Sequence, residues 1–261
     1  MLDIPILTYH KISDYREFGL TTISKKQFDL QMNYLKLNGY GSVCLKDLKT
    51  ECTLPEKPVI ITFDDGYENV YQNAVPVLNK YDFKAVIFIV TDYIGQLNTW
   101  EAAPFQQKFK HLSEDQIIDL NNNGHEIASH GKMHRYLPSL RNDRLIDEIC
   151  GSKTRLESLL GERVTSFCYP FGGFSKKIET IVKKAGYHFA TTNLKISNRN
   201  KVNPFSLSRR SIYKTDSLHS FKSKIISHEA LNISYLSEIF IQVGSLASIG
   251  LTVLRDSKSY F

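Results

Sequence analysis

Two neighbouring carboxylates stand where a metal ion or a reacting water molecule could be held. Asp64 and Asp65 directly follow an apolar run and precede Gly66. Adjacent residues on an extended strand point to opposite sides, but a turn at this glycine would let both carboxylates reach one site. One could then bind a metal ion while the other remains free as a base. The alternative is a solvated turn, because Asp-Asp-Gly is also a common turn sequence.

A pair of histidines offers two further metal ligands. His130 and His134 are four residues apart, a spacing that places two imidazoles on one face of a helical turn. The residues between them include no glutamate, so the pair does not form the His-Glu-x-x-His motif of metalloproteases. Two structural histidines are the alternative, which is weakened because this pair, like the aspartates, follows a predicted strand. One carboxylate and two imidazoles would leave a metal ion with an open position for catalysis.

Three other predicted strand ends carry polar groups. His10 follows the first strand, where a hydrolase would need an acid, although a lone histidine is usually structural. At Tyr169 the backbone amide could face an oxyanion, with a structural strand-to-helix turn as the alternative. Arg209 lies on a later predicted strand and would pair with a carboxylate inside the fold. The sequence therefore indicates metal-assisted hydrolysis of an acyl bond, in which the free aspartate takes the proton of the attacking water.

Aromatic side chains are abundant, with 15 Phe, 14 Tyr and one Trp. Most are expected in the core, but exposed aromatic rings would suit a sugar or another flat ligand. We expect substrate contacts from Tyr67 and Trp100, and from Pro170 and Phe171, which would form a groove wall.

These residues need a scaffold that brings strand ends together. Continuous apolar runs predict strands at residues 4–9, 59–63, 84–90, 126–129, 164–169, 187–191 and 207–213. Amphipathic patterns predict helices between them, at residues 24–37, 69–80, 113–122, 141–160, 175–185 and 217–227. Uninterrupted apolar strands that alternate with helices are typical of a parallel sheet buried on both faces. We therefore expect one α/β barrel-like domain with its chemistry at the C-terminal ends of the strands.

Composition excludes several classes of protein. The chain of 261 residues is 42% hydrophobic and 23% charged, which are globular values and not those of a disordered or fibrous chain. Its net charge of +6 comes from dispersed basic residues with no run of five, so we expect no nucleic-acid partner. The four cysteines form no Cys-x-x-Cys pair, which argues against a thiolate zinc site or a redox motif.

The two ends of the sequence bear on location. The chain does not open with a basic stretch followed by an apolar one, so we expect a protein that is cytoplasmic or peripheral to a membrane. Residues 239–254 form the longest uncharged run, which at sixteen residues is too short to span a membrane. We expect residues 230–261 to be an apolar C-terminal extension in the form of a docked helix. A membrane-surface contact and a contact with another subunit are the alternatives.

Two motifs resemble those of a known enzyme family. Residues 62–66, Thr-Phe-Asp-Asp-Gly, are similar to the first motif of the polysaccharide deacetylases, which are carbohydrate esterase family four with the NodB-homology domain. Ser129-His130-x-x-x-His134 is similar to the second motif. Residues 4–226 resemble in order and spacing the branch that includes the biofilm poly-N-acetylglucosamine deacetylases. The resemblance implies a single distorted (β/α)7-type barrel over residues 1–229, one divalent metal ion, usually Zn2+, and hydrolysis of N-acetyl groups on the hexosamines of a glycan.

The resemblance also implies roles for individual residues. The metal ion would be held by Asp65, His130 and His134. Asp64 would be the base, and the amide of Tyr169 would stabilise the oxyanion.

The third motif of the family departs from its usual form in this sequence. Cys168 occupies the position of an arginine that orients the catalytic aspartate in the family. We expect Arg209 to replace that arginine, because it lies on a later strand of the same barrel.

The general acid of the family comes from a Leu-x-His motif near the C-terminus, which Ile226-Ser227-His228 matches imperfectly. In the biofilm branch the corresponding strand is permuted to the N-terminus and ends in Tyr-His, which Tyr9-His10 matches. We therefore expect His10 rather than His228 to be the acid. Two other functions remain open: a related amidase or esterase acting on a non-sugar acyl group, and a glycan-binding module without turnover, against which the intact motifs count.

Overall fold

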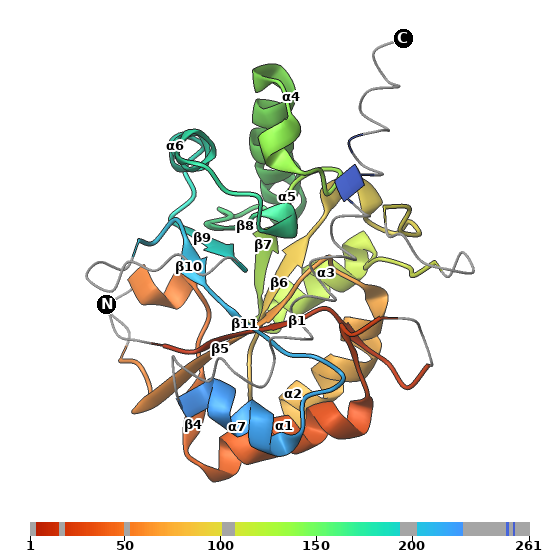
Figure 1. Cartoon of the computed structure of the whole chain (residues 1–261), viewed down its shortest axis with the longest axis vertical. Helices are drawn as coiled ribbons and strands as arrows, with labels where there is room; N and C mark the ends of the chain where they lie inside the picture. Colours follow the sequence, from red (N-terminus) through yellow and green to blue (C-terminus); the bar gives the residue numbers. More distant parts are fainter. Residues whose placement is uncertain are drawn as a thin grey trace.

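Parallel strands built from short apolar runs surround a common interior (Figure 1). This computed structural model describes residues 4–15, 19–49, 53–100, 108–193 and 203–226, together with 249, 250 and 253. The strands of the main sheet are β1 (Ile6–Tyr9), β4 (Tyr40–Ser42), β5 (Lys57–Phe63), β6 (Val86–Ile89), β7 (Glu126–Ser129), β8 (Ser166–Cys168), β9 (Phe189–Thr192), β10 (Leu207–Ser208) and β11 (Arg210–Ser211). Their order is β10-β9-β8-β7-β6-β5-β1-β11, with β4 paired to the start of β5. A separate parallel pair, β2 (Lys11–Ile12) and β3 (Thr22–Ile23), lies beyond the end of β1.

A single stretch of chain closes the sheet. β10 pairs with β9, and β11 pairs with β1, so the two edges of the sheet meet on either side of Arg209. The strand predicted over residues 207–213 is therefore present as two short strands, because the chain changes its partner at Arg209. The result is a nearly closed parallel barrel, and the expected distorted (β/α)7-type barrel is confirmed.

Helices cover the outside of this barrel (Figure 1). They are α1 (Lys25–Leu37), α2 (Val75–Lys80), α3 (Glu114–Asn122), α4 (Asn142–Ile146), α5 (Ser152–Leu160), α6 (Lys176–Lys184) and α7 (Leu218–Ile226). Two of the predicted helices contain a π-helical turn, η2 (Val70–Ala74) before α2 and η6 (Asp147–Gly151) between α4 and α5. The shorter 3-10 turns are η1 (Lys46–Lys49), η3 (Thr91–Tyr93), η5 (Leu137–Ser139) and η7 (Pro170–Gly172).

Both faces of the strands are buried, as the continuous apolar runs predict. Inside the barrel, one cluster includes Ile60, Val86, Phe88 and Phe189. Outside it, a larger cluster packs the other strand faces against the helices, including Phe28, Met32 and Leu35 of α1. Polar side chains can therefore reach solvent mainly beyond the strand ends, and candidate catalytic and metal-binding residues are expected at these ends.

Most of the predicted C-terminal extension, residues 230–261, lies outside the described residues, and so does His228. Within the described part of the chain, no helix has both the length and the apolar character needed to cross a membrane.

Glu126 places a carboxyl group inside the barrel at the N-terminal end of β7. One of its oxygens accepts a hydrogen bond from the Ser166 hydroxyl at 2.5 Å, and the other accepts from the backbone N–H of Lys46 at 2.9 Å. Burial raises the pKa of Glu126 from 4.5 to about 7, although both hydrogen bonds oppose that shift.

The stability of the fold should therefore depend on pH through Glu126. Between about pH 4.5 and about pH 7 the folded protein keeps a proton on this group that the unfolded chain releases, so the free energy of unfolding falls as pH rises. The total loss is at most about 3 kcal/mol. Glu126→Gln should remove this pH dependence, as urea unfolding at about pH 5 and about pH 8 would show.

The matched control is Asp143→Asn, which changes an exposed carboxylate of α4 and should leave the pH dependence in place. If the free energy of unfolding changes with pH equally in the wild-type protein and in Glu126→Gln, Glu126 is not the source of the pH dependence.

Candidate active site

Five of the side chains singled out in the sequence meet at one end of the barrel. His10 follows β1, Asp64 and Asp65 follow β5, and His130 follows β7. Arg209 enters from the seam between β10 and β11. Because all of these strands are parallel, their C-terminal ends open on the same mouth.

The turn after β5 sends the two adjacent carboxylates to one site. The backbone N–H of Asp64 donates to the Tyr9 carbonyl at 2.9 Å, which prolongs the pairing with β1. Asp65 and Gly66 then both take left-handed backbone angles, with φ of 71° and 70°. A Cβ atom on Gly66 would lie 2.9 Å from the Cδ1 atom of Ile89 and on a left-handed backbone, so a side chain at this position would be strained. The expectation that a turn at Gly66 brings both carboxylates together agrees with this geometry.

His130 and His134 come together on a loop, and the expected helical turn is wrong. No helix covers residues 130–134, and His134 has a left-handed φ of 55°. The loop is held from outside by Glu148 of η6, whose carboxylate accepts from the backbone N–H groups of Lys132 at 2.8 Å and Met133 at 3.0 Å. The ring centroids of the two histidines end 4.8 Å apart.

Sequence reasoning missed Glu148. A signal was present, because Leu145 and Ile149 mark the inward face of the predicted helix and Glu148 lies three residues after Leu145 on that face. An acidic residue on a buried helix face needs partners, and here the partners are the amides of the histidine loop.

Asp65, His130 and His134 form a set of donor atoms that suits a metal ion. The Oδ1 atom of Asp65 lies 3.5 Å from the Nε2 atom of His130 and 3.3 Å from the Nε2 atom of His134. The Nδ1 atom of His130 lies 2.9 Å from the carbonyl oxygen of Cys168, which can only accept, so Nδ1 carries a proton and Nε2 is the ring atom left to bind a metal ion. Burial, helped by His130, holds the pKa of His134 well below its usual range. Three electron-pair donors thus face one another, and a cation would relieve their repulsion.

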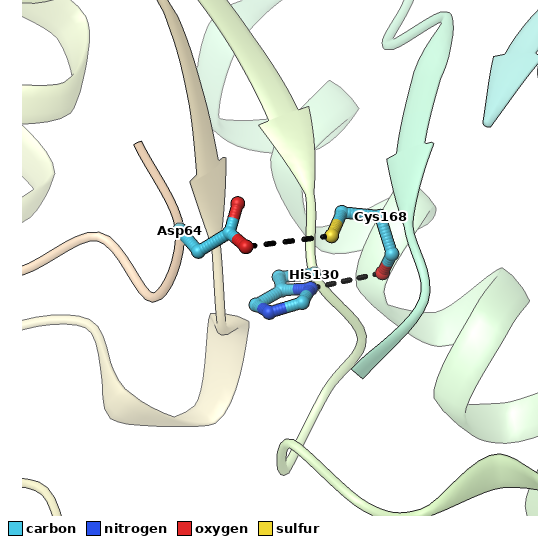
Figure 2. A group of neighbouring side chains, drawn as sticks. All are labelled: Asp64, His130 and Cys168. Carbon is cyan, nitrogen blue, oxygen red and sulfur yellow. Dashed lines mark hydrogen bonds between the residues drawn. The ribbon is translucent and has the colours of Figure 1, made fainter. Parts of the chain in front are cut away.

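A second group of potential ligands overlaps the first. Figure 2 shows Asp64, His130 and Cys168 close together at the ends of β5, β7 and β8. Both oxygens of the Asp64 carboxylate already accept hydrogen bonds from Arg209. Burial raises the pKa of the Cys168 thiol, which disfavours the thiolate form that would bind a metal ion. The group of Asp65 and the two histidines therefore fits a metal ion better.

Asp64 and Arg209 form a buried ion pair with two hydrogen bonds. The Nη1 and Nη2 atoms of Arg209 donate to the Oδ1 and Oδ2 atoms of Asp64 at 2.6 and 2.7 Å, and the two side chains are 1% and 3% exposed. Burial alone would raise the pKa of Asp64, but the guanidinium outweighs burial and holds the pKa well below its usual range. The Nη2 atom of Arg209 also lies 3.1 Å from the Cys168 thiol, so the guanidinium reaches the position where the sequence carries a cysteine.

His10 lies beside this pair and reaches solvent. Its side chain is 23% exposed, and its Nε2 atom is 3.9 Å from the Oδ2 atom of Asp64. Burial lowers the pKa of His10 to about 4, although the Asp64 carboxylate acts to raise it. The imidazole is therefore neutral at neutral pH in this state.

The expected oxyanion contact of Tyr169 is not supported by the structure. Its backbone N–H donates to the carbonyl of Thr191 at 3.1 Å, and its hydroxyl donates to the carbonyl of Phe205 at 2.9 Å. Pairing between β8 and β9 continues through this residue, which uses the amide that was expected to face the site.

Of the four predicted substrate-binding residues, Trp100 and Phe171 pack against His134. Tyr67 and Pro170 are buried, and Trp100 is 3% exposed, so these three have little surface for a substrate. Trp100 stacks on the His134 ring, with centroids 4.7 Å apart and an angle of 21° between the planes. Phe171 is partly exposed and meets the same imidazole edge-on at 4.5 Å, so of the four it retains a surface for contact.

Known proteins share both the sequence pattern and this fold. The family model for polysaccharide deacetylases matches residues 52–190. YxkH of Bacillus subtilis, a protein grouped with the polysaccharide deacetylases, is 33% identical over 193 residues, which cover 72% of this chain and 64% of the relative. A poly-β-1,6-N-acetyl-D-glucosamine N-deacetylase of Staphylococcus aureus is 25% identical over 182 residues, which cover 68% of this chain and 63% of the relative. The matched part thus spans just under two thirds of each relative.

A solved structure agrees with these matches. The Streptococcus pyogenes deacetylase PplD, determined in complex with acetate, superposes with a TM-score of 0.73 at 25% sequence identity. The alignment covers 86% of this chain and 98% of that one, so the likeness extends over the whole barrel. The chain belongs to the polysaccharide deacetylase family.

Proposed function

We propose that this chain is a metal-dependent N-deacetylase that removes acetyl groups from an N-acetylhexosamine-containing glycan or glycan precursor. The observation that carries the proposal is the position of Asp64, a buried carboxylate kept ionised by Arg209 next to the donor atoms of Asp65, His130 and His134. Membership of the polysaccharide deacetylases supports deacetylation as the reaction. The named substrate of the Staphylococcus aureus relative supports a polymer of N-acetylglucosamine as the substrate class.

Two imidazoles and one carboxylate would hold the metal ion, and this donor set suits Zn2+ with an open position. When bound there, the ion would lower the pKa of water and polarise the acyl oxygen of the substrate. The Phe171 ring, at the edge of His134, would contact the sugar.

Asp64 and His10 would move the proton that the reaction requires. Asp64 would take a proton from the water whose oxygen attacks the acyl carbon. His10 lies 3.9 Å from the same carboxylate, beyond hydrogen-bond distance, and would move closer to receive that proton and deliver it to the nitrogen as the C–N bond breaks. The products would be acetate and a free amine. The lowered pKa of His10 makes its protonated form a strong donor for a poor leaving group.

Acetate release tests this function directly. The substrates would be β-1,4-linked and β-1,6-linked N-acetylglucosamine oligomers, an N-acetylated nucleotide sugar and an aryl acetate ester, each with and without a chelator. We expect acetate from an oligomer, loss of that release with the chelator, and recovery when Zn2+ is added back. Turnover of the ester alone would indicate an esterase, and metal binding without turnover of any substrate would indicate a silent binding module.

Asp64→Asn should abolish turnover and keep the metal site. The amide cannot take the proton of the attacking water, and loss of a general base costs roughly 10²–10⁴-fold in rate. Zn2+ affinity measured by calorimetry should stay close to that of the wild-type protein, whereas Asp65→Ala should weaken it. Near-normal acetate release by Asp64→Asn would remove Asp64 from the mechanism.

His10→Ala should lower deacetylation by roughly 10²-fold or more without changing Zn2+ affinity, because it removes the proton donor and no ligand. His228→Ala is the matched control and should have little effect on either quantity. Steady-state rates with a natural oligomer measure both variants. The opposite ranking of the two variants would identify His228 as the acid.

A further inference from the structure

His111 contacts the backbone of Asp65, the carboxylate of the candidate metal site. The Nδ1 atom of His111 lies 2.9 Å from the carbonyl oxygen of Asp65. A carbonyl oxygen can only accept, so Nδ1 carries the proton and donates it to this bond. Neither the motifs nor the charge pattern of the sequence marks His111 as part of the site.

The bond acts on a backbone segment that is under strain. Asp65 has a φ of 71°, a left-handed angle that side chains other than glycine rarely adopt, and such conformations persist only where surrounding contacts hold them. Loss of the bond would leave the buried Asp65 carbonyl without this donor and would favour relaxation of the turn. Relaxation at Asp65 would carry its carboxylate away from the two imidazoles, which it now meets at 3.3 and 3.5 Å.

The His111 ring is itself fixed in place. His111 is only 2% exposed. The centroid of its ring lies 4.8 Å from the ring centroid of Tyr67 and 5.0 Å from that of Trp100. The backbone of His111 forms an antiparallel bridge with Tyr67, and the N–H of the next residue, Leu112, donates to the Gly66 carbonyl at 2.9 Å. The segment that carries His111 is thus tied to the turn that carries Asp65.

Trp100 connects the same ring cluster to a second ligand. The Trp100 ring packs against His111 with centroids 5.0 Å apart and stacks on His134 with centroids 4.7 Å apart. Both strained ligands, Asp65 and His134, are therefore held by one aromatic cluster that contains His111.

We propose that His111 is a positioning residue of the metal site, which sets metal affinity by holding the backbone of Asp65 through its Nδ1 proton. This inference rests on the metal site of the proposed function. It goes further by assigning the rigidity of the site to a residue that touches neither metal ion nor substrate.

Calorimetric titration of the metal-free protein with Zn2+ at one pH tests the proposal. His111→Phe keeps the ring and loses the donor. His111→Asn keeps a donor at the place of Nδ1, and His111→Gln carries the same amide one bond further out. We expect Zn2+ affinity to fall by roughly 10–100-fold in the Phe and Gln variants and to stay within a few-fold of wild type in the Asn variant.

His125→Phe is the matched control. His125 is also fully buried and its Nδ1 atom accepts from the backbone N–H of Ala85 at 3.1 Å, but it precedes β7 at the opposite end of the barrel. This variant should lose stability and retain Zn2+ affinity.

The outcomes separate two possible failures. If Asp65→Ala binds Zn2+ as tightly as the wild-type protein, the metal site itself is misplaced and the proposal falls with it. If Asp65→Ala weakens binding and His111→Phe does not, His111 has no positioning role. Should the Phe variant fail to fold, equal affinities of the Asn and Gln variants would overturn the proposal, and tighter binding by Asn would support it.

Discussion

The mouth of the barrel is organised around the buried ion pair between Asp64 and Arg209. Removing both charges from water is costly, and a buried pair is often no more stabilising than apolar residues of similar volume. The ion pair is better explained by its effect on Asp64, because Arg209 keeps this carboxylate ionised although it is shielded from solvent. The pair also joins β5 to the seam of the barrel, because Arg209 separates the two short strands that close the sheet. Loss of either partner would leave an uncompensated buried charge and cost about 3–5 kcal/mol.

Backbone strain is concentrated next to this pair. Among the described residues other than glycine, left-handed φ angles occur at Asp65, His134 and Phe171 in the site, and at Asp82 elsewhere. Each strained position in the site lies in the segment that follows a strand, Asp65 after β5, His134 on the loop after β7 and Phe171 after β8. Such conformations cost about 1–3 kcal/mol each and need support from their surroundings. Glu148 gives that support to the histidine loop, and the aromatic cluster packs against His134.

The sequence predicts the barrel because its signals are local and repeated. Each strand is a continuous apolar run, and the helix predicted from residue 113 begins with a capping box between Ser113 and Gln116. It also predicts that Asp64, Asp65, His130 and His134 share one mouth, since parallel strands end together. Whether these residues hold a metal ion stays a prediction.

What the sequence does not reveal is local geometry that depends on distant partners. The histidine spacing suggests a helical turn, but a loop held by Glu148 achieves the same closeness. The Tyr169 amide continues a strand ladder, which periodicity cannot distinguish from a free amide at a strand end. Tyr67 is polar enough for a surface, but it is buried because Trp100, Phe109 and His111 pack against its ring.

The most direct test of the account is the position of zinc in a crystal grown with Zn2+, located by anomalous scattering at the zinc absorption edge. The account predicts one peak at about 2.0–2.2 Å from a carboxylate oxygen of Asp65 and from the Nε2 atoms of His130 and His134, with the Asp64–Arg209 pair intact. A peak bound by Asp64, His130 and the sulfur of Cys168, with the ion pair broken, would contradict it.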